Sequence, residues 1–155
     1  MQSTLRLESA RAPSSISVVG SQSHDLSVEE YDKGKHFSLM NSWYREWGYD
    51  PIPEKYMPSI GYVVGDCVMQ FLALTDCNVV WFEGFISDPK SDPEMRRKSI
   101  NLAQELCTNK ARSLGFTRMF TFVRRQHVLD IAMKACSDNG VPALSTPGFL
   151  IEGAL

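Results

Sequence analysis

The chain has 155 residues, a formal net charge of −2 and 43% hydrophobic residues, a composition typical of one ordinary globular domain. The near-balanced charge excludes a dedicated, strongly basic nucleic-acid-binding protein, and no apolar run approaches the roughly 20 residues that cross a bilayer. Four cysteines, Cys67, Cys77, Cys107 and Cys136, lack the spacing of zinc ligands. We expect them to be reduced, in a cytoplasmic protein without a metal site.

The N-terminal segment is rich in serine and poor in aromatic residues up to about Ser27. Such a sequence buries too little apolar surface to offset the entropy that is lost on ordering. We therefore expect residues 1–35 to form an arm that is flexible or ordered by an assembly partner. Residues 36–155 are expected to form the folded domain.

The first predicted helix covers residues 36–47, where aromatic residues recur at three- and four-residue spacing. Gly48 and Pro51 end this helix, and a helical turn is expected over residues 53–57. The aromatic side chains either only pack on a sheet or also position a substrate. The candidates for substrate contact are Trp43, Tyr44 and Trp47.

Three strands are predicted between residues 60 and 86, and the tight turns between them make neighbours antiparallel. The third, over residues 79–86, is apolar on both alternating faces, as in a central strand covered on each side. Glu83 interrupts it, and an unpaired charge in such a strand is costly. Glu83 is therefore either a catalytic base that faces a cleft, or a structural carboxylate that pairs with Arg118 or Lys134 or lies at a wet edge.

A second long helix is predicted after this strand, with Asp92 as its N-cap and Gly115 as its C-terminal left-handed residue. A strand over residues 118–123 follows directly, so a right-handed crossover pairs it in parallel with the third strand. A helix over residues 125–136 and a final strand or hairpin over 143–153 complete the chain. The predicted fold class is α/β (α+β), with a mixed central sheet flanked by helices.

The segment Pro93–Asn101, PEMRRKSIN, opens the second long helix, whose N-terminus suits an anion. It resembles the acyl-CoA-binding loop of the GNAT acyltransferases, Gln/Arg-x-x-Gly-x-Gly/Ala. Arg96 falls on the first position, whereas Ser99 and Asn101 replace the two small residues. The resemblance extends from about residue 36 to the C-terminus through element order and includes Leu114-Gly115-Phe116. Because of these two replacements, the chain resembles a degenerate member of the GNAT family. It is similar to the compact proteins of this kind that bacteriophages encode.

The resemblance implies a GNAT-like fold and direct transfer of an acetyl group from acetyl-CoA to an amine of unknown identity. Glu83 would act as the base, facing the amine directly or through water. The position of the family's catalytic tyrosine corresponds to Cys136, whose thiol would protonate the leaving thiolate. The residues expected to bind acetyl-CoA are Ile86, Ser87, Arg96, Arg97, Lys98, Ser99, Ile100 and Asn101.

The basic residues Arg96, Arg97 and Lys98 oppose the dipole at a helix N-terminus, so they are either phosphate ligands or simple surface charge. A second hypothesis is a catalytically inactive GNAT-like interaction protein, such as a phage virion or assembly component held by its arm. Ser99, Asn101 and Cys136 favour this hypothesis, which would place the protein in a virion rather than in the host cytoplasm. Open backbone amides at the loop would favour the enzyme, and a filled pocket the interaction protein. Nucleic-acid binding ranks third, because aromatic residues do not alternate with the basic ones.

Overall fold

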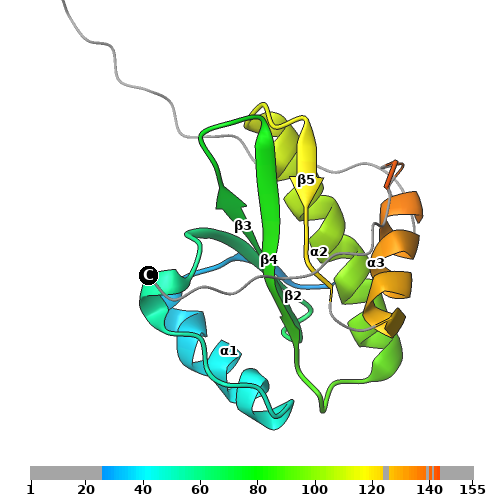
Figure 1. The fold of residues 1–155 in the computed structure, drawn as a ribbon. Helices are drawn as coiled ribbons and strands as arrows, with labels where there is room; N and C mark the ends of the chain where they lie inside the picture. The colour runs from blue at the N-terminus through cyan, green and yellow to red at the C-terminus, as the bar shows by residue number, and fades with distance from the viewer. Residues whose placement is uncertain (1–25, 124–125, 139, 141, 144–155) are drawn as a thin grey trace, which may run out of the picture.

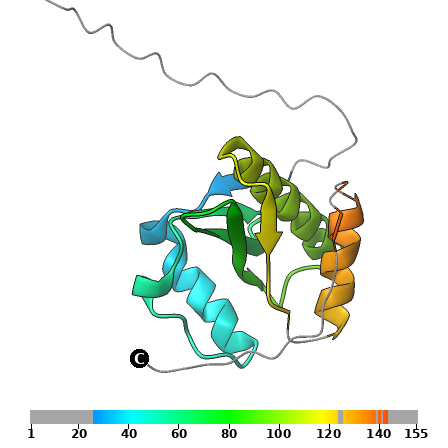
Figure 2. The same ribbon diagram turned by 45° about the horizontal axis from the view of Figure 1, so that its top comes forward.

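The computed structural model describes residues 26–123, 126–138, 140 and 142–143. A five-stranded sheet has α1 on one face and α2 with α3 on the other (Figures 1 and 2). The elements in chain order are β1 (Val28–Glu30), α1 (Lys33–Glu46), the 3₁₀ turn η1 (Glu54–Tyr56), β2 (Ile60–Val64), β3 (Val68–Leu74), β4 (Val79–Ser87), α2 (Pro93–Ser113), β5 (Arg118–Phe120) and α3 (Gln126–Asp138).

The strands lie in the order β1-β2-β3-β4-β5. Every neighbouring pair is antiparallel except β4 and β5, which are parallel. The predicted mixed sheet is therefore confirmed, with the third predicted strand in a central position as β4. The loop between β2 and β3, residues 65–67, begins with two left-handed residues, Gly65 at φ +59° and Asp66 at φ +53°, and the amide of Cys67 donates to the carbonyl of Val64 at 3.2 Å.

Two layers of apolar side chains cover the sheet. On the α1 side, Met40 and Trp43 of α1 pack against Phe71 and other residues of the sheet. On the opposite side, Leu72 and Phe82 pack against α2. β4 contributes to both layers, with Ile86 in the first and Val80 and Phe82 in the second, whereas Glu83 and Phe85 between them are exposed.

The predicted helix punctuation is confirmed. Asp92 is the N-cap of α2, and its carboxylate accepts hydrogen bonds from the amides of Glu94 and Met95. Gly115 follows the helix at φ +87°. Among the described residues, no helix is both long and apolar enough to cross a membrane.

The structure differs from the prediction at Val28–Glu30, which lie in the predicted arm but form β1 against β2. Two of these three residues are acidic, so no apolar alternation marks a strand, and the pairing with β2 creates it. α1 also begins three residues before the predicted helix, and β5 ends at Phe120 rather than at residue 123. Residues 1–25 of the arm, and residues 144–153 of the predicted terminal strand or hairpin, lie outside the described residues.

Candidate functional site

β4 continues well beyond its pairing with β5. The last parallel pair joins Trp81 to Phe120, where β5 ends, whereas β4 runs on to Ser87 (Figure 1). Within residues 26–123 and 126–138, no strand pairs with this edge of β4 after Trp81. Backbone N–H and C=O groups on such an edge are available to an extended ligand.

A bulge in β4 lies at this opening. The register between β3 and β4 shifts by one residue, so that Gly84 and Phe85 lie opposite one residue of β3. Two features require glycine at position 84. Its φ of +62° is one that other residues rarely adopt, and a Cβ there would lie 2.9 Å from the Phe71 ring. Glu83 before the bulge and Ile86 after it both face the α1 side. The bulge thus keeps the end of β4 in the core and leaves Glu83 at its boundary.

Glu83 is the titratable residue of this opening. Its side chain is exposed, yet partial burial raises the pKa of its carboxyl above the usual value. No hydrogen bond or ion pair to Glu83 forms among the described residues, and Lys134, one of the expected partners, pairs with Asp138 instead. The carboxylate is therefore free to accept a proton from a ligand.

A hollow of about 270 Å³ opens beside this carboxylate, and we refer to it as the Glu83 hollow. Its floor comes from β3 and β4, and its wall comes from the segment between α1 and β2. The side chain of Asn41 holds this wall, because its Oδ1 accepts from the amide of Ile52 at 3.0 Å and its Nδ2 donates to the carbonyl of Ile52 at 3.3 Å. The lining residues are Ile52, Tyr56, Met57 and Pro58 on the wall and Ala73, Glu83 and Gly84 on the floor.

Of the three aromatic residues expected to contact substrate, Tyr44 lies close enough to Glu83 for an electrostatic interaction. Burial, and then the charges of Glu83 and Tyr49, raise the pKa of Tyr44 to about 12, so its phenol stays protonated. Trp43 is 3% exposed and belongs to the core. The indole nitrogen of Trp47 donates to the carbonyl of Ser87 at 2.7 Å, which ties the end of α1 to the end of β4.

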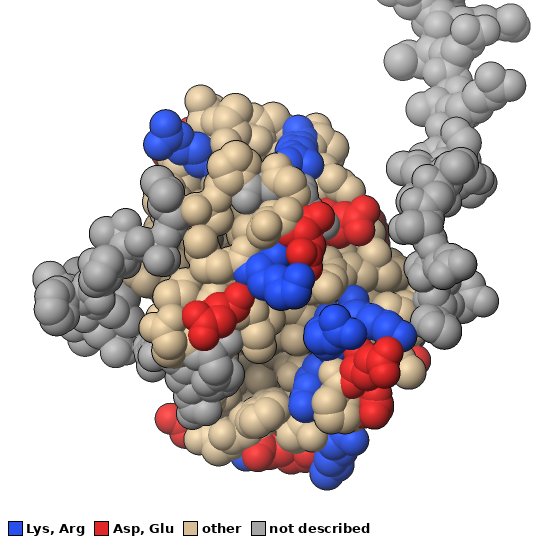
Figure 3. Space-filling model, turned by 90° about the vertical axis from the view of Figure 1, so that its right-hand side faces the viewer, with Lys and Arg blue, Asp and Glu red and all other residues tan. Residues whose placement is uncertain are grey.

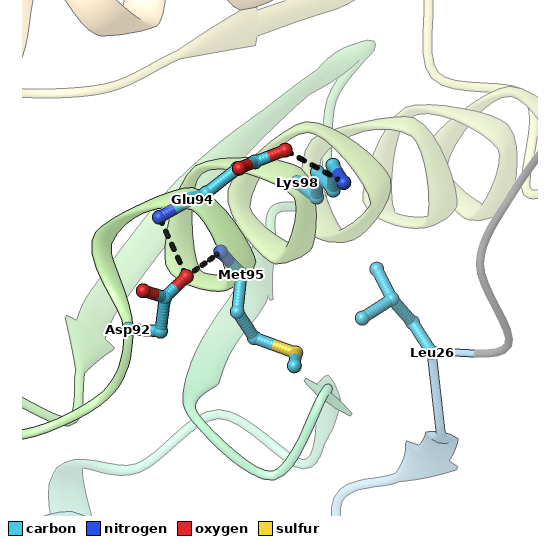
Figure 4. Close-up of a pocket in the computed structure, with 5 residues that line it drawn as sticks. All are labelled: Leu26, Asp92, Glu94, Met95 and Lys98. Atoms are coloured by element: carbon cyan, nitrogen blue, oxygen red, sulfur yellow. Dashed lines mark hydrogen bonds and ion pairs between the residues drawn. The ribbon is translucent and has the colours of Figure 1, made fainter.

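The N-terminus of α2 is closed by its own cap (Figure 4). Pro93 has no N–H, the amides of Glu94 and Met95 donate to the Asp92 carboxylate, and the amide of Arg96 donates to the Asp92 carbonyl. Of the amide donors that a helix N-terminus usually leaves free, those of residues 93–95 are thus absent or bonded, and the Arg96 bond is the first of the helical ladder. Since residues 97–101 lie inside α2, their amides belong to the helical ladder.

Two of the three expected phosphate ligands are engaged within the chain. The guanidinium of Arg96 donates to the carbonyls of Asp88 and Pro89 and lies 5.9 Å from the centroid of the Trp47 ring. Lys98 forms an ion pair with Glu94 at 2.9 Å. Arg97 is exposed and makes no hydrogen bond or ion pair within the described part of the chain. Of these three basic side chains, Arg97 is thus the one most available to an anion.

The other expected acetyl-CoA ligands lie mainly in the interior. Ser99 is fully buried, with its Oγ 3.5 Å from Sγ of Cys67, and a Cβ at Gly65 would lie only 2.3 Å from that Oγ. Ile86 is 4% exposed in the α1-side core, and Ile100 packs against the cluster of buried residues that contains Cys67 and Ala103. Asn101 is half-buried on α2. The side chain of Ser99 therefore packs in the interior against the loop between β2 and β3.

Cys136 lies on α3, on the opposite side of the sheet from Glu83. It is 8% exposed, and burial raises the pKa of its thiol, which stays protonated at neutral pH. Gln104 on α2 contacts its sulfur at 4.0 Å and accepts from Nε2 of Gln70 at 3.0 Å. Oε1 of Gln70 and Oγ1 of Thr108 are buried without a hydrogen-bond partner among the described residues.

Sequence reasoning did not identify these glutamines or the bulge. A lone glycine inside a strand, as at Gly84, is the signal that could have located the bulge. Nothing in the sequence places Gln70 opposite Gln104, because their pairing depends on the tertiary packing of α2.

The described residues contain no group of three or more His, Cys, Asp or Glu side chains that could hold a metal ion. All four cysteines are free thiols in the structure. Among the described residues of the face that α2 and α3 present, basic and acidic side chains lie interspersed (Figure 3).

No protein-family model matches the sequence, and no curated protein matches it. The fold matches solved acetyltransferases. A provisionally assigned acetyltransferase from Agrobacterium tumefaciens strain C58 superposes with a TM-score of 0.55 at 10% identity, covering 82% of this chain and 99% of its own. A second one gives a TM-score of 0.55 at 9% identity, with coverages of 84% and 99%.

AAC(6')-Iy, in complex with the bisubstrate analogue CoA-S-monomethyl-acetylneamine, superposes with a TM-score of 0.50 at 15% identity. The superposition covers 85% of this chain and all of that one. At such low identities the similarity defines architecture. The chain has the fold of the GNAT acetyltransferases.

Proposed function

We propose that the protein is an acyl-CoA-dependent N-acyltransferase that transfers an acetyl group from acetyl-CoA to an amine. The observation that carries this proposal is the position of Glu83. An unpaired carboxylate with a raised pKa lies beside a hollow, at the point where β4 loses its partner β5. A general base needs this combination of access and proton affinity.

The free edge of β4 supports acyl-CoA as the second substrate. After Trp81 its backbone N–H and C=O groups have no strand partner among the described residues, and the amide groups of a pantetheine arm would pair with them. Arg97 would contact a phosphate of the cofactor. Lys98 would contact it too, by giving up its exposed ion pair with Glu94.

In the proposed reaction, Glu83 accepts a proton from the acceptor ammonium on the α1 side of the sheet. The amine nitrogen then forms a bond to the thioester carbonyl carbon, the carbon–sulfur bond breaks, and the nitrogen releases its second proton to water. Cys136 on the opposite side would donate its proton to the departing thiolate, as the family resemblance implies, and would regain a proton from water. Its raised pKa keeps this proton in place at neutral pH, but makes the thiol a weak acid.

The first test is calorimetric titration of acetyl-CoA into the full chain and into Arg97→Glu. We expect a micromolar Kd, about −8 kcal/mol, which Arg97→Glu weakens several-fold. Arg112→Glu, an equally exposed charge reversal at the other end of α2, is the matched control and leaves the Kd unchanged. Turnover is followed by chromatography, since the exposed thiol of Cys77 would react with thiol reagents. The absence of heat and of a thermal shift at millimolar acetyl-CoA would overturn the proposal.

A second candidate is a GNAT-fold interaction protein without turnover, held in an assembly by residues 1–35. The closed N-terminus of α2 favours it, because the Asp92 carboxylate occupies the donors that a CoA diphosphate would use. Under this hypothesis acetyl-CoA fails to bind even when Asp92 is replaced by Ala. Binding restored by Asp92→Ala would point instead to a CoA site that is blocked by the cap.

A further inference from the structure

The described lining of the Glu83 hollow combines one charged side chain with a mainly apolar surface. Apart from Glu83, none of the described residues that line it carries a titratable carboxylate, amine or imidazole. The remaining lining is aliphatic, aromatic or backbone, with Met57 and Pro58 on the wall and Ala73 on the floor. A pocket of this kind binds one polar group of its ligand by a directed contact and the rest by apolar burial.

The charges around the wall disfavour a ligand with several cationic groups. Glu54, an acidic residue of η1, is neutralised by an ion pair with Lys33. Lys55 lies over the ring of Tyr56 at 4.8 Å from the centroid, and Tyr56 lines the hollow. A polyamine or aminoglycoside would meet this lysine and find one unpaired carboxylate for several ammonium groups.

An exposed aromatic surface continues from the floor of the hollow. Ala73, which lines the hollow, is the cross-strand partner of Trp81, and Trp81 projects from the same face of β4 as Glu83. The Trp81 ring stacks on Phe122 at 5.3 Å between centroids and contacts Phe120 at 5.5 Å. Phe122 is 61% exposed and Phe120 is 48% exposed. Apolar surface therefore borders the carboxylate on two sides.

We infer that the acceptor is a small primary amine with a single positive charge next to an apolar, preferably aromatic, body. Its ammonium group contacts Glu83, and its body lies between the wall at Met57 and the aromatic group around Trp81. That this amine is acetylated rests on the proposed function. Binding of the amine to the hollow can be measured without acetyl-CoA.

The test is binding of four probes to the full chain, by ligand-observed NMR and calorimetry: phenethylamine, its neutral analogue 2-phenylethanol, neamine and spermidine. We expect phenethylamine to bind about tenfold more tightly than each of the others. Glu83→Gln should reduce this affinity about tenfold, whereas Glu105→Gln, an exposed carboxylate on α2, should not change it. Trp81→Leu should reduce it about threefold through the lost ring contact.

Two results would overturn the inference: neamine or spermidine binding as tightly as phenethylamine, or phenethylamine affinity that Glu83→Gln leaves unchanged. A parallel titration with acetyl-CoA separates this outcome from failure of the proposed function. Tight acetyl-CoA binding with a preference for neamine would refute the acceptor class and preserve the acyltransferase. Glu83-dependent phenethylamine binding without any acetyl-CoA binding would refute the acyltransferase and preserve the amine site.

Discussion

The two ends of the candidate site differ in how much of their bonding capacity the chain uses for itself. At the N-terminus of α2, Asp92 takes up the free amides and Glu94 pairs with Lys98. At the Glu83 hollow, the carboxylate and the edge of β4 remain unpaired within the described residues. The segment that most resembles a family motif is thus the one most satisfied internally. Unused bonding capacity, rather than motif similarity, indicates where this chain can act on another molecule.

The variant Glu83→Gln is expected to show the largest difference between the Glu83 hollow and the N-terminus of α2, because it should change kcat. Loss of a general base typically costs about 10²- to 10⁴-fold in kcat, and we expect this loss with an arylalkylamine acceptor. The Kd for acetyl-CoA should not change, because Glu83 faces the other side of the sheet. Steady-state kinetics and calorimetry on the same preparation check both statements. Undiminished turnover would remove Glu83 from the mechanism.

The bulge provides the next largest effect. Gly84→Ala imposes a strained φ of +62° and brings a methyl group to 2.9 Å from the Phe71 ring, which should cost about 2–3 kcal/mol of unfolding free energy. Gly48→Ala is the matched control, since Gly48 has φ +76° but nothing within 4 Å of a Cβ. It should cost about 1 kcal/mol, and urea denaturation measures the difference. Equal losses would show that the ring contact does not matter.

A smaller effect is expected at the α2 cap. Asp92→Ala removes the N-cap and should lower the unfolding free energy by about 1 kcal/mol. It also frees the amides of Glu94 and Met95, so acetyl-CoA should bind several-fold more tightly if its diphosphate lies there. Glu105→Gln removes one charge from the same helix without opening its end. A similar gain in that variant would mean that net charge alone is responsible.

The smallest effect concerns the pH dependence of stability. The folded protein raises the pKa of Glu83, so the protonated carboxyl is favoured in the folded state. That contribution is present below the ordinary carboxyl pKa and is lost as the pH rises through the raised folded value. The wild type should therefore lose stability relative to Glu83→Gln over this interval. Thermal unfolding at a series of pH values checks the difference, and parallel curves would contradict it.

Local signals explain the parts of the fold that were predicted from sequence. The cap at Asp92, the left-handed Gly115 and the Gly65-Asp66 turn each act over a few residues and leave a direct trace in the sequence. β1 was not predicted, because its pairing with β2 comes from elsewhere in the chain and its acidic residues give no pattern.

The site was predictable only in part for the same reason. Glu83 stood out as a charge within an apolar strand, and the structure places it at an opening. Whether Trp47 contacts a ligand or the carbonyl of Ser87 depends on how α1 crosses the end of β4, which no local spacing encodes. Likewise, Ser99 was assigned to acetyl-CoA binding by resemblance, whereas its side chain is fully buried and contacts Cys67.

The bond between Asn41 and Ile52 has a consequence for recognition. A side-chain amide of α1 holds the wall of the Glu83 hollow by two hydrogen bonds, in the manner of a neighbouring strand. The hollow therefore has its shape without a ligand, and under the proposed function it would not need to form around the amine. Preorganisation of this kind lowers the conformational entropy that is lost when a ligand binds. Selectivity then depends on how well the ligand fits the existing shape, and not on a movement of the protein around it.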